Sequence, residues 1–342
     1  MKGAKILSEI SASPAIFERL LAAKAQFASA AELIKARDIQ AVTIVARGTS
    51  ANAGHFLKHL VETELGLPVG IAAPAAVSID KARLRHAKTL AIGLSQSGQS
   101  PDLIAYLKAS HASGALTITM TNDSDSPMAK LGDLHLPLLV GVEEVVAATK
   151  SYSAQLLSSL LLVRACTNAA QLDSNLVSRS TTLISQFDGA PTAIKAMALA
   201  KKIFFIGRGL GLAHAREGAL KIQEITGRQI QGFSAADYFH GPIAAVDGES
   251  VLCVIAPTGS NQLGIERSVA ATRERGAGIV WIGRSDLAQS GDSVITGSDL
   301  ADEATNVVLD SSLIQLLARE FAIAAGCDPD TTPGLTKVTL TE

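Results

Sequence analysis

The chain has 342 residues, of which 47% are hydrophobic and 18% charged, and its formal net charge at pH 7 is −2. This composition is typical of a well-buried α/β protein with two domains, and it excludes an intrinsically disordered chain. There is no block of basic residues and no apolar run long enough for a membrane span, so neither nucleic acid nor a membrane is a predicted partner.

Helix is predicted over residues 4–36, with a break at Pro14, because apolar residues recur there at three- and four-residue spacing. The first residues, MKGAKILSEISASP, contain no apolar signal core, so a cytoplasmic protein is expected. Cys166, Cys253 and Cys327 are far apart and lie in apolar or helical surroundings. We expect these cysteines to be reduced and buried, and their spacing predicts no metal site.

A β-branched strand at 42–45, a glycine turn and an amphipathic helix come next, and the same order returns at 202–226. Superposing the Arg-Gly pair at 47–48 on the pair at 208–209 gives an offset of 161 residues. The same offset places the glycine of SQSGQS on that of APTGSN, and it brings ALTITM near GAGIVWIG with a one-residue slip. The sequence therefore predicts an internal duplication, in which each copy is a parallel sheet covered by helices on both faces.

The predicted fold class is α/β, with two tandem domains that each form a flavodoxin-like, three-layer α/β/α sandwich. The predicted boundaries are an N-terminal helical segment at 1–35, a first domain at 36–175, a helical linker at 176–194, a second domain at 195–327 and an extended tail at 328–342. Ligands in open parallel sheets bind beyond the carboxyl ends of the strands, so the functional site is expected there.

Two hydroxyl-rich turns, ARGTS and LSQSGQS, follow predicted strands. Gly98 permits a tight turn, Pro101 suits a first helical position, and Ser100 is expected to cap that helix. Backbone N–H groups and the helix dipole at such a point favour an anion, and the lack of a lysine favours a monophosphate over a nucleoside triphosphate. The candidate phosphate-binding residues are Thr49, Ser50, Ser95, Gln96, Ser97 and Ser100. The alternative is that these residues only cap helices and fill turns.

The second copy has lost much of this hydroxyl cradle and carries a charged helix instead. Glu217, Lys221 and Glu224 lie at i, i+4 and i+7, which places them on one stripe that we expect to face the ligand edge. The alternative is an exposed salt-bridge ladder, which is ordinary on a solvated helix. His240 precedes a Gly-Pro pair that would hold its imidazole in place, although most histidines in loops have no such role.

These motifs resemble the tandem sugar-isomerase (SIS) domain family, in particular the isomerase half of glucosamine-6-phosphate synthase. The motifs that carry the resemblance are RGTS, SQSGQSPD, EEVVAATKSYSAQL, EGALKIQEI, FHGP and LTKVTLTE, in that order along nearly the whole chain. The resemblance implies a phosphosugar substrate whose phosphate is bound by the two hydroxyl-rich turns. It also implies that Arg47, Gly48, Gly98 and the backbone of Val146 and Ala147 belong to the pocket.

The resemblance implies a catalytic role for five side chains. Glu224 matches the base that moves a proton between C1 and C2 of the sugar, and Lys221 supports charge on the sugar oxygen or on Glu224. His240 matches the histidine that opens the ring, supplied across the interface of a homodimer, and Glu217 matches a carboxylate near it. Lys337 matches the lysine that forms a Schiff base with the open ketose. No metal and no other cofactor is implied.

Gln223 and Asp237 depart from the family pattern, which has a lysine and a glutamate there, and residue 2 is Lys2 where the synthase has a nucleophilic cysteine. We expect a glucosamine-6-phosphate deaminase without glutaminase activity, which releases ammonia and fructose 6-phosphate. One alternative is a deaminase/isomerase or deglycase for galactosamine 6-phosphate or fructosamine 6-phosphate. The other is a non-catalytic sugar-phosphate sensor, although the chain has no room for a helix-turn-helix module.

Overall fold

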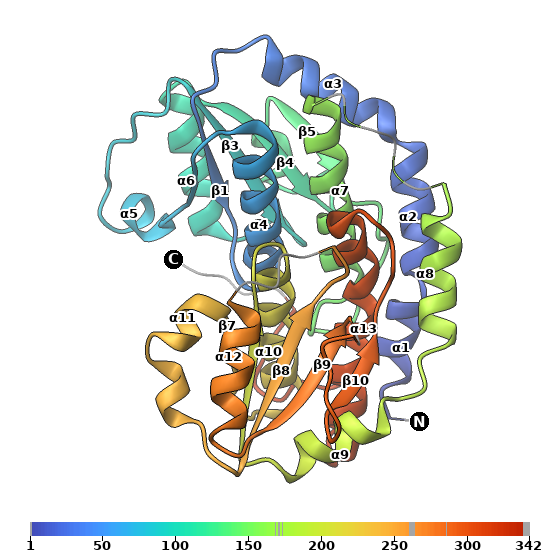
Figure 1. The fold of residues 1–342 in the computed structure, drawn as a ribbon. Coiled ribbons are helices and arrows are strands. Elements are labelled where there is room, and N and C mark those ends of the chain that lie inside the picture. The colour runs from blue at the N-terminus through green and yellow to red at the C-terminus, as the bar shows by residue number, and fades with distance from the viewer. Residues whose placement is uncertain are drawn as a thin grey trace. The chain divides into compact units, whose positions relative to one another are not determined.

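The computed structural model describes residues 2–167, 169, 172, 174–259, 264–284 and 286–337. The chain divides into two compact units, each assembled from three stretches. Unit 1 comprises Met1–Pro14, Glu144–Thr149 and Ser174–Leu335, and unit 2 comprises Ala15–Glu143, Lys150–Asp173 and Thr336–Glu342. Each unit contains one five-stranded sheet (Figure 1), and the two are described separately.

The sheet of unit 2 is entirely parallel. Its strands are β1 (Ala41–Val45), β2 (Val69–Ile71), β3 (Thr89–Ser95), β4 (Leu116–Thr121) and β5 (Leu134–Pro137), in the spatial order β2-β1-β3-β4-β5. The central strand β3 is buried along its whole length, which explains why TLAIGLS carries apolar or small residues on both faces. Because every strand runs the same way, β1 and β3 end at the same edge of the sheet.

Helices cover both faces of this sheet. They are α2 (Ser13–Ala22), α3 (Lys24–Lys35), α4 (Gly48–Leu60), the π-helix η1 (Val61–Leu65), α5 (Pro74–Ser78), α6 (Pro101–Ala112), the 3₁₀-helix η2 (Ala129–Leu131) and α7 (Lys150–Thr167). Helix α7 contacts α3 and α4, whereas α6 contacts α5 and the central strands. Helix α6 packs on the sheet through a cluster that includes Leu103, Tyr106 and Leu107.

Unit 1 repeats this design with a second parallel sheet. Its strands are β6 (Lys202–Gly207), β7 (Gln231–Ser234), β8 (Ser250–Ala256), β9 (Gly278–Gly283) and β10 (Ser293–Thr296). Its helices are α1 (Ala4–Ser11), α8 (Leu176–Ser185), α9 (Pro191–Leu199), α10 (Gly211–Thr226), α11 (Ala235–Phe239), η3 (Pro242–Ala245), α12 (Ile265–Arg273) and α13 (Glu303–Ala324). Helices α1, α8, α9 and α10 contact α13, while α11 and α12 contact each other and form a separate core with the sheet.

The two sheets have the same topology, so the predicted duplication and fold class are confirmed. The order β7-β6-β8-β9-β10 in unit 1 corresponds strand by strand to β2-β1-β3-β4-β5 in unit 2. Strands β1 and β6 begin at Ala41 and Lys202, and β3 and β8 begin at Thr89 and Ser250, so both pairs are 161 residues apart. Each sheet has helices on both faces, as expected for parallel strands.

The predicted N-terminal helix is three helices, and the expected break at Pro14 is wrong. The chain interrupts the helix after Ser11 and again at Ala23, while Pro14 is the second residue of α2. Proline is tolerated in a first turn because the N–H that it lacks has no intrahelical acceptor there. In the ranges that the structure describes, no helix is both long and apolar enough to cross a bilayer.

All three cysteines are free thiols, but only one is fully buried. Cys253 lies in β8 with 0% of its surface exposed, whereas Cys166 and Cys327 are half-buried, so the expected burial is wrong for these two. Burial raises the pKa of the Cys166 thiol to about 11, which makes the thiolate scarce at neutral pH. Within the described residues, no group of three or more His, Cys, Asp and Glu side chains could hold a metal ion.

Candidate functional site

The first hydroxyl-rich turn links β1 to α4 in unit 2. Arg47 is the N-cap residue of α4 with an extended backbone, and Gly48 takes a positive φ of 53°. Thr49 is half-buried and Ser50 is buried in the first helical turn. The first turn of a helix directs its N–H groups beyond the helix end, so the two hydroxyls lie beside backbone donors.

The second turn links β3 to α6, and its shape requires a glycine at position 98. Gly98 has a φ of 64°, and a Cβ added there would lie 2.3 Å from Ser126 Oγ. The Gly98 N–H donates to Ser95 Oγ over 3.0 Å, and the Gln99 N–H donates to Ser97 Oγ over 3.3 Å. Both serines therefore stabilise the turn, as the alternative interpretation holds, yet each hydroxyl keeps its own proton for a further acceptor.

Ser100 and Pro101 occupy the N-cap and first positions of α6, as predicted. However, the Ser100 side chain makes no capping hydrogen bond, so its expected role as a side-chain cap is wrong. The Ser100 backbone already begins the helix, and the acidic residue of the first turn is Asp102. The hydroxyl of Ser100 thus lies at the turn without a structural bond to the helix that follows it.

An ion pair that the sequence analysis did not identify connects the two turns. Arg47 donates from Nε and Nη2 to Asp102 Oδ2 over 2.7 Å and 2.6 Å. The Asp102 side chain is 0% exposed, and its Oδ1 accepts from the Leu103 N–H. Because Arg47 begins α4 and Asp102 lies in the first turn of α6, the pair fixes the distance between the turns. The sequence feature that could have indicated this ion pair is the aspartate of SQSGQSPD, one residue after the proline.

Helix α7 connects the first turn to the tail lysine within unit 2. Gln155 Nε2 donates to Ser50 Oγ over 2.8 Å, and both residues are buried. One turn earlier on α7, Ser151 donates from its N–H and its hydroxyl to the carboxylate of Glu143. Lys337 Nζ lies 3.0 Å from Glu143 Oε2. The structure therefore places Lys337 within about two helical turns of the Ser50 hydroxyl along α7.

The charged stripe of unit 1 is buried. Glu217 and Lys221 have side chains that are 0% and 1% exposed, and Lys221 Nζ lies 3.6 Å from Glu217 Oε1. Lys221 also pairs with Glu224, whose side chain is 21% exposed. The three residues share one face of α10, as predicted, and α10 packs against α13 and the sheet. The alternative of an exposed salt-bridge ladder is wrong, because water cannot reach the Glu217–Lys221 pair.

The expectation that this stripe faces the carboxyl edge of its own sheet is wrong for Glu224. Helix α10 begins at Gly211, beyond the carboxyl end of β6, and then returns along the sheet. Glu224 is 13 residues further on, which places it about 20 Å along the helix from that edge. The stripe is continuous, but its partly exposed end, Glu224, lies near Thr226, the last residue of α10.

Glu224 opens into a cavity of about 700 Å³ in unit 1. The end of α10 forms one side of this cavity, and the segment after α13 forms the other. The lining residues are Leu220, Gln223, Glu224, Ile225, Thr226, Gly227, Cys327, Asp328, Thr331, Pro333 and Leu335. The partly exposed carboxylate of Glu224 thus meets a space large enough for a small sugar, and Gln223 shares it.

His240 is exposed and directly follows α11. Its neighbours fix the backbone: the buried Tyr238 hydroxyl lies 2.8 Å from Thr272 Oγ1, and the guanidinium of Arg267 lies over the ring of Phe239 at 4.5 Å. The imidazole of His240 is thus exposed at the C-cap position of α11, on a backbone held by its neighbours.

The loop that carries Val146 and Ala147 is anchored by a buried acid. Glu9 of α1 accepts from the N–H groups of Glu144 and Val145 over 2.5 Å and 3.3 Å. The Ala147 side chain is 0% exposed and packs into the core of unit 1, whereas Val146 is half-buried. The side chains therefore hold the loop in place, which leaves its backbone as the part that could contact a ligand.

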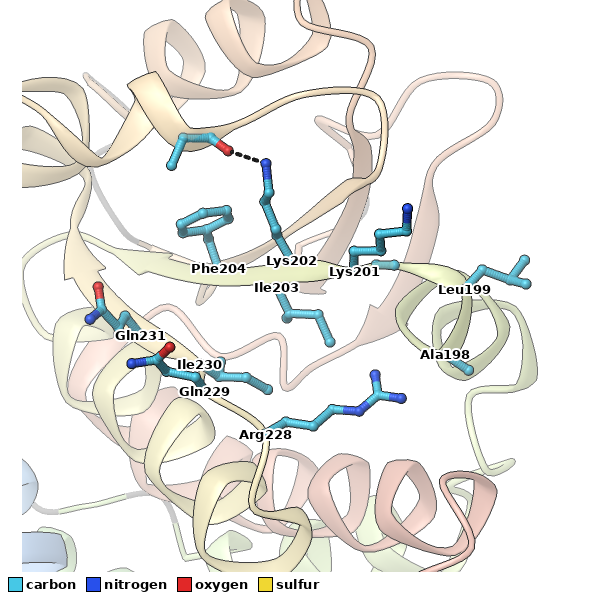
Figure 2. Close-up of a pocket in the computed structure, with 12 residues that line it drawn as sticks. Ala198, Leu199, Lys201, Lys202, Ile203, Phe204, Arg228, Gln229, Ile230 and Gln231 are labelled. Carbon is cyan, nitrogen blue, oxygen red and sulfur yellow. Dashed lines mark hydrogen bonds between the residues drawn. The ribbon is translucent and has the colours of Figure 1, made fainter.

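A slightly larger cavity, of about 760 Å³, lies at the edge of the unit 1 sheet where β6 and β7 begin (Figure 2). It is lined by the residues that begin β6 and β7 and by the chain that precedes both strands. Its two lysines are already paired, Lys201 with Glu249 and Lys202 with Asp247. Parallel sheets usually bind ligands at the carboxyl ends of their strands, and neither this cavity nor the one beside Glu224 lies at that edge of the unit 1 sheet, so cavity volume alone does not locate the site.

Comparison with known proteins identifies the repeated unit. The SIS domain model matches residues 32–165 and 196–325. The chain is 31% identical over 311 residues to the isomerizing glutamine–fructose-6-phosphate aminotransferase of Caulobacter vibrioides, and this match covers 86% of the chain and 51% of that protein. The chain thus spans about half the length of the curated relatives that it matches.

Two solved structures share the fold over nearly the whole chain. One is the C-terminal domain of glucosamine-fructose-6-phosphate aminotransferase from Francisella tularensis, with a TM-score of 0.79, 23% identity, and coverage of 95% of this chain and 97% of that one. The other is a glucosamine-6-phosphate deaminase from Thermotoga maritima, with a TM-score of 0.76, 23% identity, and coverage of 99% and 100%.

Proposed function

This chain belongs to the SIS domain family, and we propose that it is a phosphosugar isomerase that acts as a glucosamine-6-phosphate deaminase. The reaction converts glucosamine 6-phosphate and water into fructose 6-phosphate and ammonia. The substrate class comes from the relatives, which are named for fructose 6-phosphate or glucosamine 6-phosphate. The observation that carries the proposal is the pair of hydroxyl-rich turns, which Arg47 and the buried carboxylate of Asp102 fix in place.

The two turns of unit 2 bind the phosphate. Phosphate oxygens accept hydrogen bonds, and the turns supply donors from hydroxyls and from the first turns of α4 and α6. Asp102 already neutralises Arg47, so most of the binding comes from neutral donors. A neutral cradle suits a monophosphate, because a nucleoside triphosphate demands cations for its greater charge.

Proton transfer belongs to α10 of unit 1. Glu224 removes the proton from C2 of the open-chain aldose and returns it at C1, while one proton of the substrate's ammonium moves to O1, which leaves an iminium at C2. Water then adds to C2 and ammonia leaves, which gives fructose 6-phosphate. The ammonium of Lys221 lies beside the Glu224 carboxylate and stabilises the negative charge that develops on the sugar oxygen.

Lys337 and His240 complete the proposed mechanism. The Lys337 amine attacks C2 of the iminium and ammonia leaves, or it attacks C2 of the open ketose and water leaves; either Schiff base is then hydrolysed by water to fructose 6-phosphate and free lysine. Glu143 supports this role because its buried carboxylate holds the Lys337 side chain in place. His240 acts as the general acid and base that opens the sugar ring, and we propose a homodimer in which it serves the sugar bound by the partner subunit.

The test is to incubate the protein with glucosamine 6-phosphate in the absence of glutamine and to measure ammonia and fructose 6-phosphate together. Equal amounts of the two products support the proposal. Galactosamine 6-phosphate and fructosamine 6-phosphate, assayed in parallel, identify the alternative substrates. Binding of a sugar phosphate with no turnover of any substrate would instead favour the sensor.

The mechanism is tested with Glu224→Gln, which removes the base but keeps the shape of the side chain. Turnover should fall at least about a hundredfold, while the Kd for the sugar phosphate stays within about threefold. Glu266→Gln is the matched control, since it makes the same change on an exposed position of α12 in the same unit. Wild-type turnover by Glu224→Gln would refute the assignment of Glu224 as the base.

A further inference from the structure

We propose that Gln155 is a positioning residue that orients the Ser50 hydroxyl so that its proton points to the bound phosphate. The inference rests on the proposed function, because it requires Ser50 to bind phosphate. Gln155 lies on α7 and, in the part of the chain that the structure describes, contacts the candidate phosphate-binding residues through Ser50. The ligand class is any phosphorylated sugar or inorganic phosphate.

The contact determines which way the serine proton points. Gln155 Nε2 donates to Ser50 Oγ over 2.8 Å, and the two residues are 0% and 8% exposed. A serine hydroxyl has one proton to donate and two lone pairs that accept. Because the amide occupies a lone pair, the serine proton stays available, and a phosphate oxygen is the acceptor that needs it.

The orientation of Gln155 has a cost in stability. Gln155 Oε1 is buried and has no hydrogen-bond partner among the residues that the structure describes. A buried carbonyl oxygen without a partner destabilises the folded chain. Rotating the amide would let Oε1 accept the proton of Ser50, but that proton would then be lost to the ligand. The observed orientation leaves the Ser50 proton free for a ligand, at a cost in stability.

The second copy of the fold offers a natural comparison. Gln315 lies on α13, 160 residues after Gln155, and it is also buried. Its Nε2 donates to the backbone oxygen of Thr149 over 2.9 Å. The position equivalent to Ser50, 161 residues later, is Gly211, which has no hydroxyl to accept a hydrogen bond. Both copies thus keep a buried glutamine, and in the copy with the hydroxyl cradle that glutamine donates to a serine of the cradle.

The test replaces Gln155 with methionine, which has nearly the same shape and no polar atom. Gln155→Met should raise the Kd for glucosamine 6-phosphate and for inorganic phosphate about tenfold, while the melting temperature stays equal or rises. Binding is measured by calorimetry, and KM and kcat are measured by turnover. We expect KM to rise and kcat to stay close to the wild-type value. Ser159→Ala is the matched control, because it removes another partnerless, buried polar atom from α7. That variant should leave Kd unchanged.

Ser50→Ala and the double variant Ser50→Ala/Gln155→Met separate the possible failures. If Gln155 acts through Ser50, the tenfold effect of Gln155→Met disappears once Ser50 is alanine. A Gln155→Met protein that binds phosphate as wild type does, while Ser50→Ala binds weakly, overturns the inference and leaves the proposed function standing. Wild-type binding by Ser50→Ala overturns the phosphate cradle, and with it both proposals. A Gln155→Met protein with both weaker phosphate binding and a lower melting temperature would indicate a structural role for Gln155, and this result would also refute the inference.

Discussion

Replacing Lys221 with methionine should destabilise the protein strongly, because Lys221 lies between two acids in the interior of unit 1. The side chains of Lys221 and Glu217 are 1% and 0% exposed, and their charged atoms are 3.6 Å apart. Methionine fills much of the same volume but removes the cation, so the Glu217 carboxylate remains buried without it. Removing one partner of a buried ion pair typically costs about 3–5 kcal/mol.

The magnitude can be measured in a urea titration at pH 7. A decrease of about 4 kcal/mol in the free energy of unfolding corresponds to a fall of roughly 10 °C in the melting temperature for a unit of this size. The decisive comparison is the double variant Glu217→Gln/Lys221→Met, which removes both charges. It should be markedly more stable than Lys221→Met alone, because a buried pair replaced by neutral residues costs little.

Two results would contradict this reasoning. If Lys221→Met lowers the free energy of unfolding by less than about 1 kcal/mol, the Glu217–Lys221 pair contributes no more than an exposed ion pair does. A double variant as unstable as the single one would show that Lys221 contributes through packing rather than charge. Turnover separates stability from chemistry: the double variant should fold, yet remain inactive, because Glu224 has lost its neighbouring ammonium.

Three further perturbations test other parts of the molecule. Asp102→Asn should weaken the Kd for a sugar phosphate about tenfold in calorimetry, because Arg47 loses the buried charge that fixes the two turns; unchanged affinity would refute this. Gly98→Ala should lower the free energy of unfolding by at least about 2 kcal/mol, since the positive φ and the nearby Ser126 leave no room for a Cβ, and a neutral effect in urea would contradict it. Burial lowers the pKa of His214 to about 4, so the unfolded chain takes up the proton first, and stability falls by about 3 kcal/mol as the pH drops from about 6.5 to 4. His214→Gln should flatten that part of the pH profile, and an equally steep fall would show that other groups cause it.

Much of the fold was predictable because the chain contains two copies of the same sequence of strands and helices. The strands of both copies are apolar, the glycine turns recur at a fixed offset, and a parallel sheet follows from the alternation of strand and helix. The breaks in the N-terminal helices were not predictable in this way. Pro14 suggested a break, but a proline is equally at home in the first turn of a helix, and only the packing of Ile6 and Ile10 shows where α1 ends.

The site was predictable in its residue types and less so in its contacts. The turns around Gly48 and Gly98 could be recognised from local sequence, since positive φ and hydroxyl content are local properties. The partnership of Arg47 with Asp102, across 55 residues, depends on how two strands neighbour each other. The burial of Lys221 likewise depends on α13, and spacing on one helix cannot distinguish a buried stripe from a solvated one.

The way each unit is assembled from three separate stretches limits how this protein could be divided. A fragment that began at the predicted second domain would lack Ile6, Ile10 and Val145, all of which belong to the core of unit 1. It would also lack Glu9, whose carboxylate anchors the loop before α7. The duplicated halves are therefore no longer interchangeable modules, because a fragment cut at the boundary between the copies would leave part of the core of unit 1 behind.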